Sequence, residues 1–362
     1  MTNAVPNDGS FSIGRCRVGR SARAFVIAEV GLAHDGSLGT AHAFIDAVAT
    51  TGADAVKFQT HIADAESTPA EPFRVKFSTQ DVSRYDYWHR TSFAESQWAE
   101  LSAHATERGL VFLSSPFSLE AVELLERIDV PAWKVGSGEV RTAPMLSRMV
   151  ATGKPLLIST GMASWADMDE TVRLVRQAGA PFAMLQCTSS YPCPPERVGL
   201  NVLTELGGRY QCPVGLSDHS GRIFAALAAT VLGAKVIEVH VTLSRHAFGP
   251  DVSASLTPAE FKEMVDGIRQ TETMMATPVN KDQASKEMAP MRAIFAKSLV
   301  AARDLAAGRN VTAGDIAMKK PGTGIPADRL DEYVGRRLRR DLEKDRLLSE
   351  DDFEPIEPGG VQ

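Results

Sequence analysis

Two lysines and two histidines occupy comparable places in this sequence, because each lies in or directly after a short apolar run. Lys57 and Lys134 lie inside such runs, whereas His219 and His240 lie at the ends of two others. A lysine buried in an apolar strand needs an anionic partner, since burying an unpaired charge costs free energy. Hydroxyl groups near the ends of other runs would bind the same anion: Ser114, Ser137, Ser159 and Ser217. We interpret the set as a site for a phosphate or a carboxylate.

An alternative is that each lysine pairs with an internal carboxylate, such as Glu29 or Glu139. The turn at 135–138, Val-Gly-Ser-Gly, adds backbone N–H groups of the kind that form anion nests. It is not a Walker A loop, because no G-x-x-x-x-G-K-[ST] surrounds it. Taken together, the lysines, hydroxyls and turn favour an anionic ligand over internal pairing alone.

The two histidines predict a metal site if their strands are neighbours. Adjacent strands lie roughly 5 Å apart, so the imidazoles of His219 and His240 could share one ion. Two imidazoles with oxygen ligands suit Mn²⁺ or a related divalent ion, and no thiolate is placed to make a structural zinc site. Carboxylates that could act as acid or base, or hold a lysine or histidine, are Glu29, Glu139, Asp218, Glu238 and Asp251.

Eight short apolar runs alternate with helix-like segments, and this alternation predicts the elements that position these groups. The runs are 25–30, 55–58, 111–113, 132–135, 156–158, 182–185, 214–216 and 236–241. Segments with helical periodicity are 40–51, 96–108, 119–127, 143–152, 167–177, 201–210, 222–232 and 258–274. Such alternation predicts a parallel sheet with right-handed crossovers. Eight units favour closure into a β/α barrel, whose active sites lie at the carboxyl ends of the strands.

An open doubly wound sheet is the structural alternative, although no G-x-G-x-x-G follows the first strand. Residues 61–91 interrupt the alternation with a long polar and aromatic segment, which is typical of a lid or binding loop; a disordered excursion is the alternative. The pattern changes again after Met275. We therefore predict a barrel over 1–276, a linker over 277–291 and a second domain over 292–362.

Composition excludes several classes of protein. The 362 residues are 44% hydrophobic and 23% charged, as in ordinary globular proteins. With 39 Lys and Arg against 45 Asp and Glu, a general nucleic-acid binder is not expected. No apolar stretch is long enough to span a membrane, and we see no signal peptide. Four cysteines without a C-x-x-C pair indicate reduced thiols in the cytoplasm.

Several motifs, in order, resemble the sialic acid synthase family, which comprises N-acetylneuraminate synthases and other nonulosonic acid synthases. They are IAEVG at 27–31, GADAVKFQT at 52–60, SSPF at 114–117, KVGSGE at 134–139, STGM at 159–162, CTSSYP at 187–192, GLSDHS at 215–220 and GPD at 249–251. The tail, with KSLVA at 297–301 and KKPGTG at 319–324, resembles the family's antifreeze-like (SAF) domain. The resemblance extends from about residue 11 to 353.

The resemblance implies a (β/α)8 TIM barrel followed by a SAF domain, in a swapped homodimer whose SAF domain covers the partner's active site. It implies condensation of phosphoenolpyruvate with an aldose such as N-acetylmannosamine, with loss of phosphate by C–O cleavage. His219 and His240 would hold the metal, Mn²⁺ in the first place and Mg²⁺ or Co²⁺ otherwise. Phosphoenolpyruvate would be held by Lys57, Gln59, Ser114, Lys134, Ser137, Ser159 and Ser217. The sugar or reacting waters would face Glu29, Glu139, Tyr191 and Asp251, with Glu29 or Asp251 moving protons.

The chain departs from the family pattern mainly at the sugar end. Lys320 stands where many members carry an arginine that reaches the N-acyl group of the substrate, and a lysine lacks the planar fork of a guanidinium. Further departures are Leu32-Ala33-His34-Asp35, Gln186, Ser189, Val239 and Val241. Two other functions remain open. One is a Schiff-base pyruvate aldolase that uses Lys134 or Lys57, and the other is a catalytically silent barrel that binds sugars.

Overall fold

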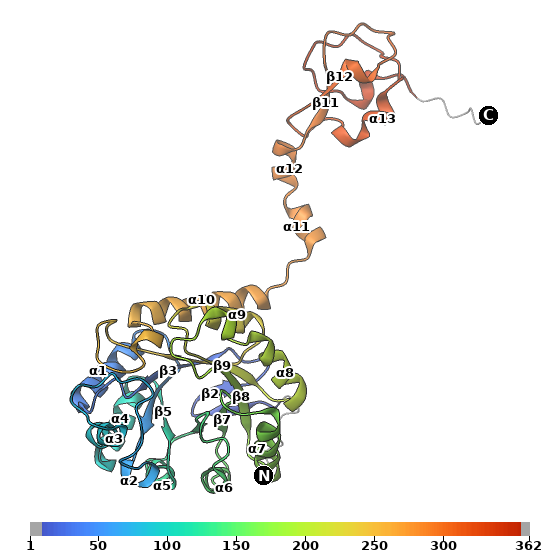
Figure 1. Ribbon diagram of the computed structural model, residues 1–362. Helices are drawn as coiled ribbons and strands as arrows, with labels where there is room; N and C mark the ends of the chain where they lie inside the picture. Colours follow the sequence, from blue (N-terminus) through green and yellow to red (C-terminus); the bar gives the residue numbers. More distant parts are fainter. Residues whose placement is uncertain (1–8, 356–362) are drawn as a thin grey trace. The chain divides into compact units, whose positions relative to one another are not determined.

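The computed structural model describes residues 9–355, which form two compact units divided between Thr277 and Pro278 (Figure 1). The first unit contains the barrel and the second contains the C-terminal domain. The finer predicted boundaries, 1–276, 277–291 and 292–362, stay predictions.

Eight parallel strands form the barrel of the first unit, in the order β5-β4-β3-β10-β9-β8-β7-β6. No hydrogen-bonded ladder joins β5 to β6 within residues 9–355, so the barrel is nearly closed. The predicted barrel is confirmed and the open doubly wound alternative is wrong. The strands are β3 (Phe25–Gly31), β4 (Ala55–Thr60), β5 (Val111–Pro116), β6 (Trp133–Val135), β7 (Leu156–Ser159), β8 (Phe182–Cys187), β9 (Val214–Asp218) and β10 (Val236–His240).

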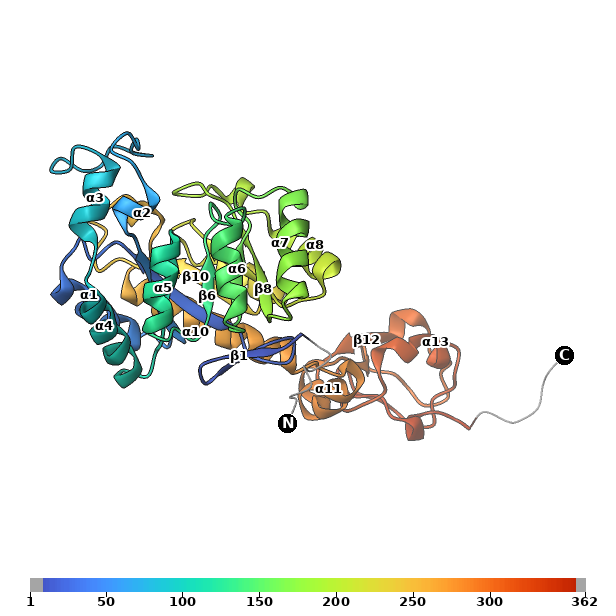
Figure 2. The ribbon, with the colours of Figure 1, turned by 90° about the horizontal axis from the view of Figure 1, so that it is seen from below.

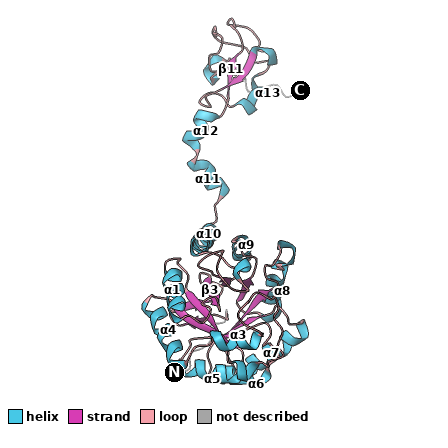
Figure 3. Ribbon diagram, turned by 60° about the vertical axis from the view of Figure 1, so that its left-hand side comes forward, coloured by secondary structure: helices cyan, strands magenta, loops and turns pink. Residues whose placement is uncertain are grey.

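Helices follow the strands and surround them (Figures 2 and 3). They are α1 (Leu38–Ala49), α4 (Glu95–Glu107), α5 (Leu119–Arg127), α6 (Ala143–Ala151), α7 (Trp165–Gln177), α8 (Leu200–Tyr210), α9 (Phe224–Val231) and α10 (Pro258–Ala276). Side-chain caps fix where several of them begin. Ser118 accepts a hydrogen bond from the backbone of Ala121 at the start of α5, and Thr257 caps α10 in the same way.

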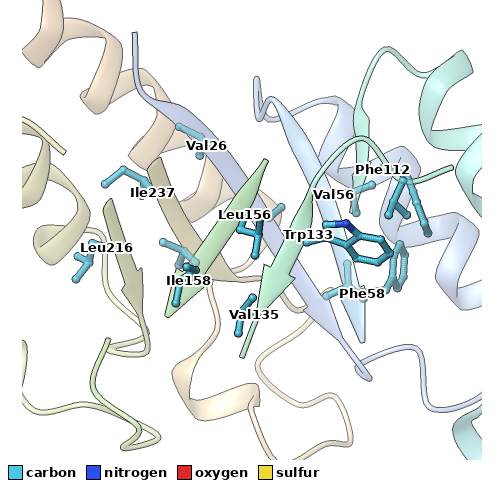
Figure 4. Packing of buried hydrophobic residues seen from close by; sticks show 14 of the residues in the cluster. Val26, Val56, Phe58, Phe112, Trp133, Val135, Leu156, Ile158, Leu216 and Ile237 are labelled. Atoms are coloured by element: carbon cyan, nitrogen blue, oxygen red, sulfur yellow. The ribbon is translucent and has the colours of Figure 1, made fainter. Parts of the chain in front are cut away.

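Successive side chains of each strand point to opposite faces, and this alternation builds two separate cores. On β3, Val26 and Ala28 face the helices, where they join a large cluster that includes Val56, Phe58 and Ile158 (Figure 4). Phe25 and Ile27 face the inside of the barrel instead. There they pack with other inward residues of the strands, which are Ala55, Val111, Leu113, Ala132, Leu157, Ala183, Leu185 and Val236.

A short hairpin closes the amino-terminal end of the barrel. Its strands, β1 (Phe11–Ile13) and β2 (Cys16–Val18), pair antiparallel. Phe11, Ile13 and Val18 belong to the inner core. The next inward position along most strands is polar, as with Glu29 after Ile27. The barrel is therefore apolar at its closed end and chemically functional at the carboxyl ends of its strands.

The segment between β4 and α4 is more ordered than the predicted loop. It contains α2 (Ala63–Glu66) and α3 (Arg84–Thr91), and Ser83 forms a capping box with Asp86 at the start of α3. The segment also has a small core in which Tyr87 and Trp88 pack with Leu32 and Ala63. The prediction of a long loop is wrong for residues 63–66 and 84–91, which are helical.

The second unit contains α11 (Lys281–Glu287), α12 (Ala289–Phe295) and α13 (Leu330–Tyr333), with β11 (Ser298–Ala301) paired antiparallel to β12 (Ile316–Lys319). Its apolar core includes Leu299, Tyr333 and Phe353. Two buried aspartates, Asp315 and Asp352, each close a 3₁₀ turn and bind arginines.

Candidate active site

A cavity of about 540 Å³ lies at the carboxyl ends of the barrel strands. It is lined by nearly all the residues that the sequence singled out. These are Glu29, Lys57, Gln59, Lys134, Ser137, Glu139, Ser159, Tyr191, Ser217, His219, His240 and Asp251. Ser114 and Lys320 are not among its lining residues. Lys320 belongs to the second unit, where its ammonium lies 5.0 Å from the ring centre of Phe295.

The two lysines meet inside the barrel around one carboxylate. Lys57 Nζ is 2.8 Å from Glu29 Oε2 and 3.7 Å from Glu238 Oε2. Lys134 Nζ is 3.5 Å from Glu238 Oε1 and donates a 2.8 Å hydrogen bond to Ser159. Lys57 therefore pairs with an internal carboxylate, Glu29, as the alternative interpretation of the sequence stated. Both lysines nevertheless line the cavity, together with the hydroxyl groups of several serines.

Burial and neighbouring charges shift the pKa values of the two lysines, of Glu29 and of Glu238 in different directions. Burial lowers the pKa of Lys134 despite the attraction of Glu238. Burial acts the same way on Lys57, but Glu238 and Glu29 outweigh it, so the pKa of Lys57 is raised. The pKa of Glu29 is raised by burial, whereas Lys134 and Lys57 lower the pKa of Glu238 against its own burial. Glu238 is thus the carboxylate that both lysines hold ionised.

Strand phase decides which serine reaches the lysines. Ser115 points into the barrel and accepts a 3.0 Å hydrogen bond from Lys57 Nζ. Ser114, the residue that the sequence favoured, is hydrogen-bonded to Thr60 Oγ1 at 2.7 Å and does not line the cavity. The structure therefore places Ser115 where Ser114 was expected, because adjacent residues of a strand face opposite sides.

The two histidines stand side by side at the ends of β9 and β10. Their ring centres are 5.3 Å apart, and Tyr191 lies 4.1 Å from the ring of His219. His219 Nδ1 is 2.9 Å from the carbonyl oxygen of Thr188. A carbonyl oxygen only accepts, so Nδ1 carries the hydrogen and Nε2 keeps a free lone pair. Burial lowers the pKa of His219 to about 3, which keeps the ring neutral.

This donor set fits a divalent ion with an incomplete protein shell. A neutral imidazole whose other nitrogen is hydrogen-bonded is the usual form of a metal-binding histidine. Within the described part of the chain, no group of three or more His, Cys, Asp and Glu side chains forms a complete metal site. Two imidazoles would therefore leave coordination positions for oxygen atoms of substrate or water, as catalytic sites do.

Residues from the 61–91 segment form the outer wall of the cavity, which the sequence did not predict in detail. The guanidinium of Arg74 lies 4.0 Å from the ring centre of Tyr191 and 2.7 Å from Asp251. Tyr87 also lines the cavity, and its buried hydroxyl has no hydrogen-bond partner among the described residues. Only the aromatic and basic composition of the segment could have indicated this wall.

A hydrogen-bonded chain connects Glu29 with the same segment. Gln59 donates a 3.0 Å hydrogen bond to Glu29, and its amide oxygen is 3.3 Å from His61 Nε2. The other nitrogen of His61 is 2.6 Å from Glu66. The His61 ring is stacked between Trp88 and Phe117, at 3.8 and 4.2 Å. The sequence could have indicated one member of this series of hydrogen bonds. Gln59 follows Lys57 by two residues and therefore faces the same side of the strand.

The fold and the cavity define a class of protein: a β/α-barrel enzyme with paired lysines and paired histidines at the carboxyl ends of its strands, joined to a small C-terminal domain. Comparison with known families agrees with both parts. The model of the NeuB family matches residues 44–280, and the SAF domain matches residues 296–354. This chain belongs to the NeuB family. The predicted family and the predicted SAF domain are thereby confirmed.

Similar proteins include the N,N'-diacetyllegionaminic acid synthase of Campylobacter jejuni, which is 35% identical over 91% of this chain and 99% of its own length. The human N-acetylneuraminate-9-phosphate synthase is 34% identical over 92% of this chain and 94% of its own length. Among solved structures, the N-acetylneuraminic acid synthetase of Leptospira borgpetersenii in complex with citrate is similar with a TM-score of 0.69. It is 25% identical over 78% of this chain and 97% of the other.

These relatives agree with the prediction of a sialic acid synthase-like enzyme, and their names give different sugar acids as products. No helix within residues 9–355 combines the length and apolar character that crossing a bilayer requires.

Proposed function

We propose that this protein condenses phosphoenolpyruvate with an aldose and releases a 2-keto sugar acid and phosphate. The observation that carries the proposal is the convergence of Lys57 and Lys134 with the paired imidazoles of His219 and His240 on one cavity. Phosphoenolpyruvate carries a phosphate and a carboxylate, which two ammonium groups and a rim of hydroxyls would bind. The names of the relatives support a sugar acid as the product.

In the proposed reaction, C3 of phosphoenolpyruvate attacks the aldehyde carbon of the aldose, and the aldehyde oxygen takes up a proton. Water then adds to C2, and the tetrahedral species loses phosphate as its C–O bond breaks. Lys57, Lys134, Ser115 and Ser159 would orient the phosphate and carboxylate. His219 and His240 would hold a divalent ion, with Mn²⁺ the first choice and Mg²⁺ or Co²⁺ the others. When bound, the ion supplies a Lewis acid that polarises the aldehyde oxygen.

Glu29 is the residue that we propose takes the proton from the water that adds to C2. Its carboxylate lies inside the barrel beside Lys57 and is oriented by Gln59. Asp251, the other candidate, is engaged by Arg74 near the outer wall. Arg74 and Tyr191 would then contact the aldose, together with Glu139 and Asp251. The outer wall carries Arg74 and Tyr191, whereas the inside of the barrel carries the two lysines. This difference supports separate binding places for the aldose and for phosphoenolpyruvate.

The test is a phosphate-release screen with phosphoenolpyruvate and Mn²⁺ against N-acylated, diamino-dideoxy and unsubstituted hexoses. We expect turnover with at least one aldose that a chelator abolishes, and no turnover from His219→Ala. Full activity of His219→Ala would remove the metal assignment. Binding of phosphoenolpyruvate without phosphate release from any aldose would favour the silent sugar-binding barrel.

A second candidate rests on Lys134, because burial lowers its pKa, as a Schiff-base lysine requires. A pyruvate aldolase of this kind would be trapped as a covalent adduct by borohydride and would tolerate a chelator. The absence of an adduct at Lys134, with chelator-sensitive phosphate release, would exclude it.

We further propose a cytoplasmic, domain-swapped homodimer in which the SAF domain and Lys320 of one chain complete the other chain's site. The four free cysteines support the location, since disulfides are rare in the cytoplasm. Light scattering would give the oligomeric state. Co-expression of His219→Ala with Lys320→Ala tests the exchange, because mixed dimers would contain one intact composite site. Activity no higher than that of either variant alone would contradict the exchange.

A further inference from the structure

The orientation of Glu29, the proposed base, depends on the side-chain amide of Gln59. The amide donates a 3.0 Å hydrogen bond from Nε2 to Glu29 Oε1. Rotation of the amide by 180° would exchange its nitrogen and its oxygen, and would turn Oε1 toward the Glu29 carboxylate. Two acceptor oxygens would then face each other where a hydrogen bond is now made. The direction of this amide therefore decides whether Glu29 is held or repelled.

Packing does not choose between the two directions of the amide. The side chain of Gln59 lies against the backbone of β3 at Gly31, where a Cβ would be 3.5 Å from the amide nitrogen and 3.7 Å from the amide oxygen. Nitrogen and oxygen are of similar size and lie at nearly the same distance from this position. The choice must therefore come from hydrogen-bond partners, as it does for amide side chains in general.

His61 supplies the hydrogen bond that makes this choice. Its Nε2 is 3.3 Å from Gln59 Oε1, and its Nδ1 is 2.6 Å from Glu66 Oε1. An amide oxygen only accepts, and an ionised carboxylate only accepts, so a hydrogen lies in each of the two contacts. The Nε2–H of His61 holds the oxygen of the amide on its own side and leaves the amide nitrogen to donate to Glu29.

The His61 ring is itself held on both faces and at both nitrogens. Trp88 of α3 is stacked on one face with the ring planes inclined by 6°, and Phe117, which follows β5, is stacked on the other at 11°. The side chains of His61 and Glu66 are only 5% and 7% exposed. Glu66 also accepts a 3.4 Å hydrogen bond from the backbone of Ile62. The direction of the Nε2–H is thus fixed by three separate segments of the chain.

We propose that His61 is a positioning residue that acts on Glu29 through Gln59. The inference rests on the proposed function, because it takes Glu29 as the acceptor of the proton of the attacking water. Without the ring N–H, the amide can turn its oxygen toward Glu29, and the carboxylate is displaced. A displacement of about 1 Å can cost about 100-fold in rate. Loss of the His61 N–H should therefore lower kcat roughly 10- to 100-fold, with KM for both substrates changed less than about threefold.

The test is a double-mutant cycle in the full-length chain. His61→Phe keeps an aromatic ring between Trp88 and Phe117 but removes both ring nitrogens, and Gln59→Leu removes the amide. His61→Phe should lower kcat at least about tenfold when Gln59 is present, and less than about twofold in a chain that already carries Gln59→Leu. Losses that multiply in the double variant, or an unchanged kcat of His61→Phe, would overturn the inference.

Two controls separate positioning from damage to the fold. Glu66→Gln breaks the same buried contact but leaves the Nε2–H in place, so it should lower kcat less than His61→Phe does. His89→Phe removes an exposed imidazole of α3 that is 3.1 Å from Asp64, and it should leave kcat unchanged. Equal losses of kcat from His61→Phe and Glu66→Gln would show that the contact only maintains the fold, and would overturn the inference.

Nuclear magnetic resonance of the chain labelled with ¹⁵N-histidine tests the arrangement without turnover. Comparison with His61→Phe identifies the ring signals of His61. Its Nε2 should carry a hydrogen whose signal shifts in Gln59→Leu and not in His89→Phe. A bare Nε2 would overturn the inference even in an active enzyme. If no aldose gives phosphate release, the proposed function fails, and the hydrogen on Nε2 still decides whether His61 holds Gln59.

Discussion

Replacing Glu238 with glutamine tests whether the cavity is an anion site whose two lysines are held by one internal carboxylate. Glu238 is 4% exposed and lies 3.5 Å from Lys134 Nζ and 3.7 Å from Lys57 Nζ. The substitution leaves Lys134 buried without a carboxylate, whereas Lys57 keeps Glu29 at 2.8 Å. Breaking one buried ion pair in this way costs about 3–5 kcal/mol. At about 2 °C per kcal/mol for a domain of this size, Glu238→Gln should lower the Tm of the barrel by roughly 6–10 °C.

The same substitution should make the barrel respond more strongly to an anion. Inorganic phosphate can replace the lost negative charge, and a ligand at a hundred times its Kd stabilises the folded state by about 2.7 kcal/mol. We therefore expect phosphate to recover about half of the lost Tm, and to bind Glu238→Gln more tightly than the unmodified chain. Scanning calorimetry at several phosphate concentrations measures both effects.

Glu139→Gln provides the matched control, because Glu139 lines the same cavity but accepts its 2.9 Å hydrogen bond from Thr142 rather than from a lysine. It should lose little stability and gain no phosphate response. An equal response of the two variants to phosphate, or an unchanged Tm for Glu238→Gln, would refute the proposed electrostatic balance.

Three further predictions follow from individual contacts. Ser115→Ala should weaken phosphoenolpyruvate binding roughly 10- to 100-fold, since a hydrogen bond to a charged group contributes about 1.5–3 kcal/mol. Ser114→Ala should leave the affinity unchanged, and equal effects of the two substitutions in calorimetry would contradict the assignment of Ser115 to the cavity. Arg74→Lys should raise KM for the aldose and leave KM for phosphoenolpyruvate unchanged, because lysine lacks the planar group that stacks on Tyr191; an effect on phosphoenolpyruvate alone would place Arg74 elsewhere. Hydrogen bonds from neighbouring side chains and backbone lower the pKa of Asp315 against the effect of its burial. The carboxylate therefore stabilises the second unit above pH 4, and this stabilisation is lost as the pH falls below 4. Asp315→Asn should flatten the acid dependence of the second unit's Tm, and an unchanged pH profile of the Tm would contradict this prediction.

The sequence predicted the barrel because each strand run is followed by a helix of suitable length. It predicted the chemistry less exactly, because apolar runs mark where strands lie but not where they end. β5 continues through Ser114 and Ser115 to Pro116, so the choice between the two serines depended on the inward phase. In the structure Val111 and Leu113 are inner-core residues, which makes Ser115 the next inward position. The run Val111-Phe112-Leu113 is apolar at every position, so the sequence alone did not give this phase.

Other features could not be predicted because they depend on contacts between distant segments. The helix at Arg84–Thr91 is short and polar on average, and the capping box formed by Ser83 was the available signal. The pairing of Arg74 with Asp251 joins residues 177 positions apart.

The two lysine contacts show why closure of the barrel matters more to this site than any single motif. Glu29 and Lys57 are direct neighbours in the register of β3 and β4, so their pairing follows from adjacent strands alone. Lys134 on β6 and Glu238 on β10 are four places apart in the strand order, and their contact crosses the barrel. An open sheet would retain the first contact and lose the second. The shared carboxylate that holds both ammonium groups at one cavity is therefore a consequence of the nearly closed barrel, and every step assigned to the two lysines depends on it.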